Sequence, residues 1–157
     1  MLLLHGWDPA KPGDPFWFTI GGAAERGEML RQAAARELRE EAGITVDEAE
    51  LGEPFETAQI EFTWAGIRFD QDQTFYAVLL DGADVTFDGQ EALERATIDK
   101  HGWLLPEELA DGSAGRPADP ELPRLMRAAV AFLRSAGSCP LRCPGRFGAV
   151  SGFLLKH

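Results

Sequence analysis

Three glutamates crowd one short segment of the chain. Glu37, Glu40 and Glu41 stand at positions i, i+3 and i+4 within the run RELREEAGI. In a helix these side chains fall within about 100° of arc, on one face. Because like charges at this spacing destabilise a helix slightly, we expect a cation between them. The best candidate is a hard divalent ion, Mg²⁺ or Mn²⁺, which prefers oxygen ligands and also binds water or phosphate.

The residues around the glutamates predict a strand, a glycine loop and a helix, in that order. The apolar run 16–20 predicts a strand, and Gly21 and Gly22 allow a sharp turn after it. Strong helix formers follow from Met29 onward. Gly43 is a typical C-terminal stop for such a helix. The acidic face is therefore expected to lie near the glycine loop.

The segment from Gly22 to Ile44 carries a resemblance to a known family. Gly22, Glu28 and the run that begins at Arg36 match the pattern G-x5-E-x7-R-E-U-x-E-E-x-G-U at every fixed position. This pattern is the Nudix box, so the chain resembles the Nudix hydrolases. A chance match is rarer than roughly one in a million at average residue frequencies.

The resemblance implies a metal site and its ligands. It assigns Glu37 and Glu41 as the principal metal ligands, and Glu40 as a ligand or the catalytic base. The carbonyl of Gly21 is a further ligand by analogy. Mg²⁺ or Mn²⁺ held there would stabilise the charge that grows when water attacks a pyrophosphate bond.

Other roles follow from the same resemblance. Arg36 and Glu28 are expected to pair and to hold the loop and helix in register, although an ordinary surface ion pair is the alternative. The residue that acts as general base is left open: it is either a glutamate of the Nudix box or one from a distal segment. Glu91 and Glu94 are the distal candidates, because they precede Trp103 in the expected region.

The box does not select a substrate. The family features that specialise its members lie downstream, where residues 60–62 read Ile-Glu-Phe. Neither the proline of an ADP-ribose type nor the tyrosine of a dinucleoside polyphosphate type is present there. We expect hydrolysis of a pyrophosphate bond in a nucleoside diphosphate derivative. The alternatives are a nucleoside triphosphate pyrophosphatase of the housecleaning type and a non-catalytic Nudix-fold nucleotide-binding module.

Net charge and hydropathy limit the classes of molecule that this protein is expected to bind. A net charge of -11 at pH 7 argues against general nucleic-acid binding, which favours a basic surface. An anionic nucleotide substrate would therefore need bound metal and a few local basic residues to offset the repulsion. The chain has no apolar run long enough to span a membrane, and residues 1–4 are too short for a secretory signal. Cys139 and Cys143 show no metal motif and are expected to be a reduced pair, with a disulfide as the alternative. We expect a cytoplasmic enzyme that acts on a small nucleotide, and a homodimer is left open.

The pattern of expected strands and helices predicts an α/β fold, and the resemblance implies a Nudix-type α/β/α sandwich with a mixed β-sheet. The expected division is a Nudix domain over residues 1–136 and a C-terminal tail over 137–157. The N-terminal strand is expected to be shortened, because Leu2–Leu4 lacks the strand and hairpin that usually precede it in this family. A strand over 147–155 could occupy the edge left open, with a loosely packed tail as the alternative.

The remaining chain offers further elements. Strands are expected at 60–64, 67–69, 74–80 and 101–105, with a short strand around Leu51. A helical turn is expected from Pro106, and a helix with an apolar stripe from Leu122 to Leu133. Residues 90–95 could form either a short helix or an active-site loop. The aromatic residues are expected in the core, with one or two free to stack on a nucleobase: Trp17, Phe62, Trp64, Phe69 and Tyr76.

Overall fold

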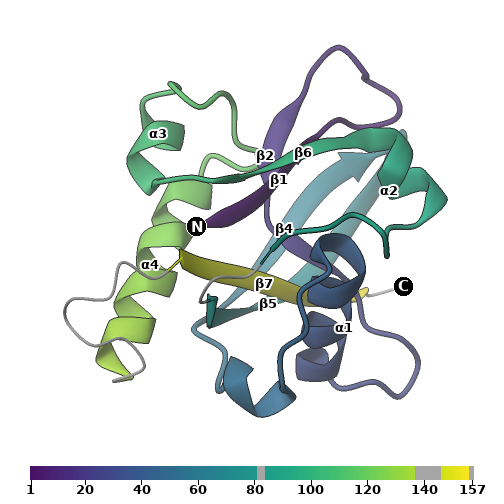
Figure 1. Ribbon diagram of the computed structural model, residues 1–157. Helices are drawn as coiled ribbons and strands as arrows, with labels where there is room; N and C mark the ends of the chain where they lie inside the picture. Colours follow the sequence, from purple (N-terminus) through teal and green to yellow (C-terminus); the bar gives the residue numbers. More distant parts are fainter. Residues whose placement is uncertain (81–83, 137–145, 156–157) are drawn as a thin grey trace.

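The computed structural model describes residues 1–80 and 84–136, and the backbone alone of residues 146–155 (Figure 1). Within these ranges seven strands form one mixed sheet, in which the order β2-β1-β7-β5-β4 is extended by β3 beside β7 and by β6 beside β1. The strands are β1 (Leu2–Gly6), β2 (Phe16–Phe18), β3 (Ile20–Ala23), β4 (Glu56–Trp64), β5 (Ile67–Leu80), β6 (Ile98–Trp103) and β7 (Arg146–Leu155).

Four α-helices and one 3₁₀ helix complete the described part of the chain: α1 (Leu30–Ala42), η1 (Glu48–Leu51), α2 (Ala92–Thr97), α3 (Pro106–Ala110) and α4 (Leu122–Ser135). None of these helices is long and apolar enough to cross a membrane. The expected strand around Leu51 is wrong, because the Asp47 side chain accepts the Ala49 N–H at 2.9 Å and starts a 3₁₀ turn there. The open segment 90–95 is resolved as the start of α2.

Apolar side chains cover both faces of the sheet. On β1, Leu2 and Leu4 belong to a core that includes Leu38 of α1, whereas Leu3 belongs to a second core with Met126 of α4. Successive side chains of a strand point to opposite faces, so the two cores lie on opposite sides of the sheet. Figure 1 shows α1 and α4 separated by the strands. The α/β class is therefore confirmed.

β7 lies inside the sheet. It pairs antiparallel with β5 from Gln71 to Leu80, parallel with β3, and at one position with β1. The strand considered for residues 147–155 is present, but its expected place at the edge left by the short N-terminus is wrong, because it is paired on both sides. An interior strand satisfies its backbone groups on both sides, whereas an edge strand leaves one row unpaired.

The predicted strand and helix are present, but the sharp turn expected at Gly21 and Gly22 is wrong. Both glycines lie within β3, paired with β7, and the connection to α1 starts after Ala23. Helix α1 ends at Gly43, whose φ of 69° is left-handed and whose N–H donates to Arg39 O. A glycine is favoured there because it adopts this conformation without strain. The unit presents one face of α1 toward β3, and this face carries the box glutamates.

Candidate active site

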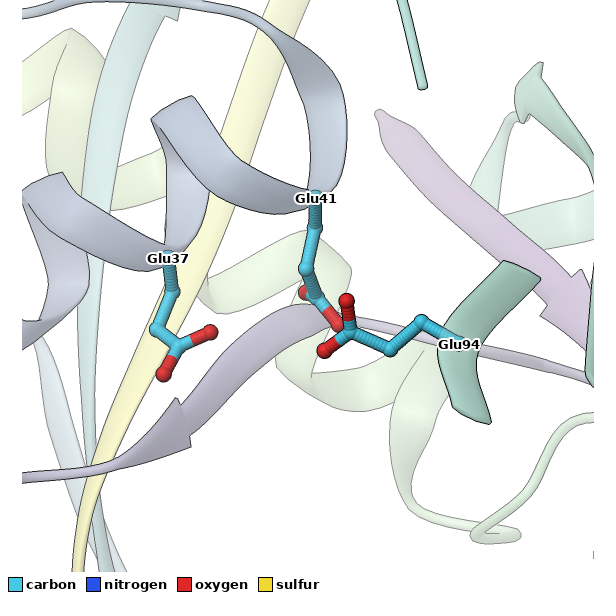
Figure 2. Close-up of side chains that lie close together, drawn as sticks. All are labelled: Glu37, Glu41 and Glu94. Atoms are coloured by element: carbon cyan, nitrogen blue, oxygen red, sulfur yellow. The ribbon is translucent and has the colours of Figure 1, made fainter. Parts of the chain in front are cut away.

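Three carboxylates meet beside α1 (Figure 2). Glu37 and Glu41 of α1 and Glu94 of α2 each offer an oxygen, and these oxygens lie within 4.8 Å of one another. Glu37 and Glu41 are 8% and 5% exposed, so two of the three carboxylates are buried. We refer to these three residues as the carboxylate cluster. The first two share a helix face as the sequence predicts, whereas Glu94 comes from a separate element.

The segment before α2 brings Glu94 to the cluster. Thr86 N–H donates to Ala42 O at 2.9 Å, and the Gln90 side-chain amide donates to Glu41 O at 3.3 Å. A Cβ at Gly89 would lie 2.7 Å from Glu40 O, so the segment packs directly on the end of α1. This docking fixes α2 beside α1. Sequence reasoning offered Glu94 only as a candidate base, because nothing local indicates such a distant contact.

Glu41 is the most deeply buried member of the cluster. Its Oε2 accepts the Gly21 N–H at 2.8 Å, so β3 and α1 are joined at this point. Burial raises the pKa of Glu41 well above its ordinary value; the Gly21 hydrogen bond opposes this shift, and the charges of Glu37 and Glu94 add to it. The contact involves the N–H of Gly21, and the predicted metal-ligand role of its carbonyl stays a prediction.

Glu37 packs against the backbone of β3 at Gly22. A Cβ at Gly22 would lie 2.1 Å from Glu37 Oε1, so only glycine leaves room for this carboxylate. Burial is the main cause that raises the pKa of Glu37, and its bond to Arg36 opposes the shift. The backbone of β3 therefore forms a close-fitting wall for the cluster.

Arg36 connects the end of β3 and the loop that follows it to the acidic face of α1. Its Nε and Nη2 each donate to Glu28 at 3.0 Å, and Nη2 also donates to Ala23 O at 3.0 Å. Nη1 donates to Glu37 at 2.7 Å and to Glu40 at 3.1 Å. The predicted pairing of Arg36 and Glu28 is thus present, as a two-pronged contact. It lowers the pKa of Glu28 and raises that of Arg36.

Two predicted candidates lie outside the carboxylate cluster. Glu40 accepts hydrogen bonds from Arg36 and, at 3.4 Å, from Arg39, and its side chain is 37% exposed. Glu91 is exposed at the start of α2, where its N–H donates to Glu94 Oε2 at 2.7 Å. The roles predicted for both residues stay predictions.

The donor set of the cluster fits a hard divalent cation. Three carboxylates supply only oxygen, which Mg²⁺ and Mn²⁺ prefer. Two of them are buried with raised pKa values, so their ionised forms need a positive charge nearby. Arg36 contacts Glu37 but is not among the partners of Glu41. A dication is the simplest group that balances Glu37, Glu41 and Glu94 together.

Comparison with known proteins adds one finding. The family model described as the NUDIX domain matches residues 1–126, which is most of the chain and includes the strand, loop and helix that build the site. No match was found among curated proteins. No solved structure matches the chain either.

Proposed function

Because the chain belongs to the Nudix family, we propose that it hydrolyses a pyrophosphate bond within a nucleoside diphosphate linked to a second moiety. The observation that carries the proposal is the carboxylate cluster of Glu37, Glu41 and Glu94. Its members lie on the elements that hold the Nudix box and on the helix that docks against them. The two cores on opposite faces of the sheet support the α/β/α sandwich expected of this family.

The carboxylate cluster would hold the positively charged ion that this reaction needs. Glu37, Glu41 and Glu94 would hold Mg²⁺ or Mn²⁺, which stabilises negative charge on phosphate oxygens and makes nearby water more acidic. In this assignment Glu94 is a ligand rather than the base. Gly21 orients Glu41 through its N–H, so the ligand geometry is set before substrate arrives.

Two further box residues complete the proposed mechanism. Water attacks one phosphorus of the pyrophosphate, and the bond from that phosphorus to the bridging oxygen breaks. We assign the carboxylate of Glu40 as the group that takes the proton from this water, because it is half-exposed beside the cluster and is not one of its members. Arg36 holds Glu40 at 3.1 Å and Glu28 at 3.0 Å, so it positions the base and the loop together.

Product analysis tests this function. The protein is incubated with Mg²⁺ and a panel of sugar nucleotides, dinucleoside polyphosphates, ADP-ribose-like compounds and nucleoside triphosphates. Release of a nucleoside monophosphate and the phosphorylated second moiety supports the proposal, and pyrophosphate release from triphosphates alone would favour the housecleaning activity. Binding without turnover across the panel would favour a non-catalytic module.

Two variants make the assay specific. Glu41→Gln should lose nearly all turnover while it remains folded. Glu107→Gln changes an exposed glutamate on α3, away from the site, and should behave as the unsubstituted protein. Retained activity in Glu41→Gln would contradict the metal assignment.

A further inference from the structure

A cleft of about 690 Å³ opens beside the active site. It is bordered by the β4–β5 hairpin, by β2, and by the chain that leads into α4. Gly21 is one of its lining residues and also donates its N–H to Glu41. Gly21 therefore lines the cleft and contacts the carboxylate cluster, so a substrate could reach from one to the other.

Gln71 is an unusual residue in the wall of this cleft. Its side chain lies on β5 and is 2% exposed, yet its Nε2 has no hydrogen-bond partner within the described structure. Nearly all buried polar groups are hydrogen-bonded, because a buried amide without a partner loses its hydration and gains nothing in return. The missing acceptor is therefore expected to come from a molecule that enters the cleft.

One part of the surface next to Gln71 is apolar and aromatic. Gln71 pairs in register with Ile60 of β4, and the neighbouring pair on the same face is Phe62 with Phe69. The two phenyl rings are stacked, with centroids 5.2 Å apart and planes at 14°. Phe62 is also 36% exposed and lines the cleft. One aromatic surface thus lies next to one unpaired amide donor.

Charge in the cleft is already balanced at its two arginines. Arg116 pairs with Asp14 at 2.9 Å, and Arg124 pairs with Glu56 at 2.6 Å. These guanidinium groups are committed to carboxylates, so they are poor candidates for phosphate contacts. Lys11 also lines the cleft, but it lies on the loop between β1 and β2 and not on the hairpin that carries Gln71. At the hairpin wall a neutral ring with a polar edge therefore fits better than an anion does.

We propose that this cleft binds the nucleobase of the substrate. Gln71 Nε2 donates a hydrogen bond to a carbonyl oxygen or ring nitrogen on the edge of the base, and Phe62 contacts its face. This inference rests on the proposed function, since it assumes that the phosphates lie at the carboxylate cluster. Gln71 is thereby a specificity-determining residue for a reaction whose chemistry takes place elsewhere.

The first test measures binding without catalysis. The metal-free protein is titrated with the common nucleosides and with ribose, and tryptophan fluorescence is followed, because Trp64 lines the cleft. Nucleosides should bind and ribose should not. Gln71→Met, which keeps the length of the side chain and removes the donor, should weaken nucleoside binding by about tenfold or more. Thr57→Val on the same hairpin is the control, because Thr57 is exposed and is not part of the cleft.

The second test measures selectivity during turnover. For nucleotide substrates, Gln71→Met should raise KM by about tenfold and change kcat little. For a ribose diphosphate that lacks a base, the variant and the unsubstituted protein should be equal. A purely structural role for Gln71 would change both substrates alike. Phe62→Leu, at an exposed position, provides a second variant with the same expected selectivity if Gln71→Met does not fold.

The outcomes separate the two proposals. Nucleoside binding that depends on Gln71, without hydrolysis of any compound, would overturn the proposed function and leave this inference standing. Hydrolysis with equal KM values for base-containing and base-free substrates in both variants would overturn this inference and leave the function. Absence of nucleoside binding to the unsubstituted protein would also overturn it.

Discussion

Gly22 and Glu37 fit so closely that a Cβ atom at residue 22 would lie 2.1 Å from Glu37 Oε1. A contact that short forces one group to move, and the carboxylate is the more flexible partner. We therefore expect Gly22→Ala to displace Glu37 from the cluster. Activity should fall by about 100-fold, on the scale of losing one positioned electrostatic group. Steady-state kinetics at several Mg²⁺ concentrations would measure the loss.

Gly13 provides the control for this substitution. A Cβ at Gly13 would meet nothing within 4 Å, and the residue lies in an exposed loop. Gly13→Ala should therefore leave activity and melting temperature unchanged. Full activity in Gly22→Ala would show that Glu37 need not occupy its observed position.

Glu41→Gln should change activity and stability in opposite directions. Glutamine keeps the size of the side chain and can still accept the Gly21 N–H, but it removes a buried negative charge. Without metal, the variant should be more stable by about 1–3 kcal/mol, the usual range for relieving an unsatisfied buried polar group. Turnover should fall at least about 100-fold. Denaturant unfolding in EDTA and the hydrolysis assay would measure the two effects.

Added Mg²⁺ supplies the matching control. A ligand that binds the folded state stabilises it in proportion to the logarithm of its concentration. The unsubstituted protein should therefore gain stability from millimolar Mg²⁺, and Glu41→Gln should gain much less. An equal gain in both proteins would place the ion elsewhere.

The parts of this site that the sequence predicts depend on near neighbours. The i, i+4 spacing of Glu37 and Glu41 places them on one face of any helix, and Gly43 ends that helix through its left-handed backbone. Arg36 and Glu28 are eight residues apart along a short loop and helix, within reach of each other. Local geometry suffices for all of these contacts.

The parts that the sequence does not predict depend on distant contacts. Glu94 joins the cluster because the segment around Gly89 packs on the end of α1, across about fifty residues of chain. β7 enters the middle of the sheet because β3 and β5 present unpaired backbone there. The amide of Gln71 looks like an ordinary polar residue in a strand until β4 and the chain near α4 enclose it. The sequence indicates Glu94 as a candidate and a strand over 147–155, but it does not indicate the contacts that place them or the enclosure of Gln71.

The pH dependence of stability should report the carboxylate cluster. Burial raises the pKa of Glu37 and Glu41 above the ordinary value of 4.5, so the folded metal-free protein binds more protons than the unfolded chain above that pH. Stability should therefore fall as pH rises from about 4.5 through the raised pKa values. Thermal unfolding in EDTA from pH 5 to pH 8 would show this decline.

Carboxylates outside the cluster affect stability in a different pH range. Glu28 and Glu56 have lowered pKa values because each pairs with an arginine, so their contribution is lost only as pH falls below 4.5. Mg²⁺ should flatten the decline above pH 5, and so should Glu41→Gln. A decline that persists undiminished in both conditions would assign it to groups outside the cluster.

Glu94→Gln should distinguish a metal ligand from a general base. If Glu94 is a ligand, the variant should need about 10- to 100-fold more Mg²⁺ for half-maximal activity, with the shape of the pH–rate profile retained. Loss of the acidic limb of that profile at saturating Mg²⁺ would instead identify Glu94 as the base. Glu91→Gln is the matched control on the same segment, because Glu91 is exposed and lies outside the cluster. Its turnover should be undiminished.

Arg36→Lys should show whether the arginine network is functional. Arginine reaches Glu28 with two donors and also contacts Glu37, Glu40 and Ala23 O, whereas lysine is a single point charge. We expect kcat to fall by about 10- to 100-fold, since the loop and the proposed base lose their common support.

Arg127→Lys is the comparison for that substitution, since Arg127 is half-exposed on α4 and pairs only at 3.3 Å with Glu107 among the ion pairs of the described residues. An exposed pair of this kind contributes about 0–1 kcal/mol, so activity and stability should both be retained. Unchanged kcat in Arg36→Lys, with the same small loss of stability as Arg127→Lys, would reduce the Arg36–Glu28 contact to an ordinary surface ion pair. A selective loss of kcat would instead show that the two-pronged contact positions the catalytic groups.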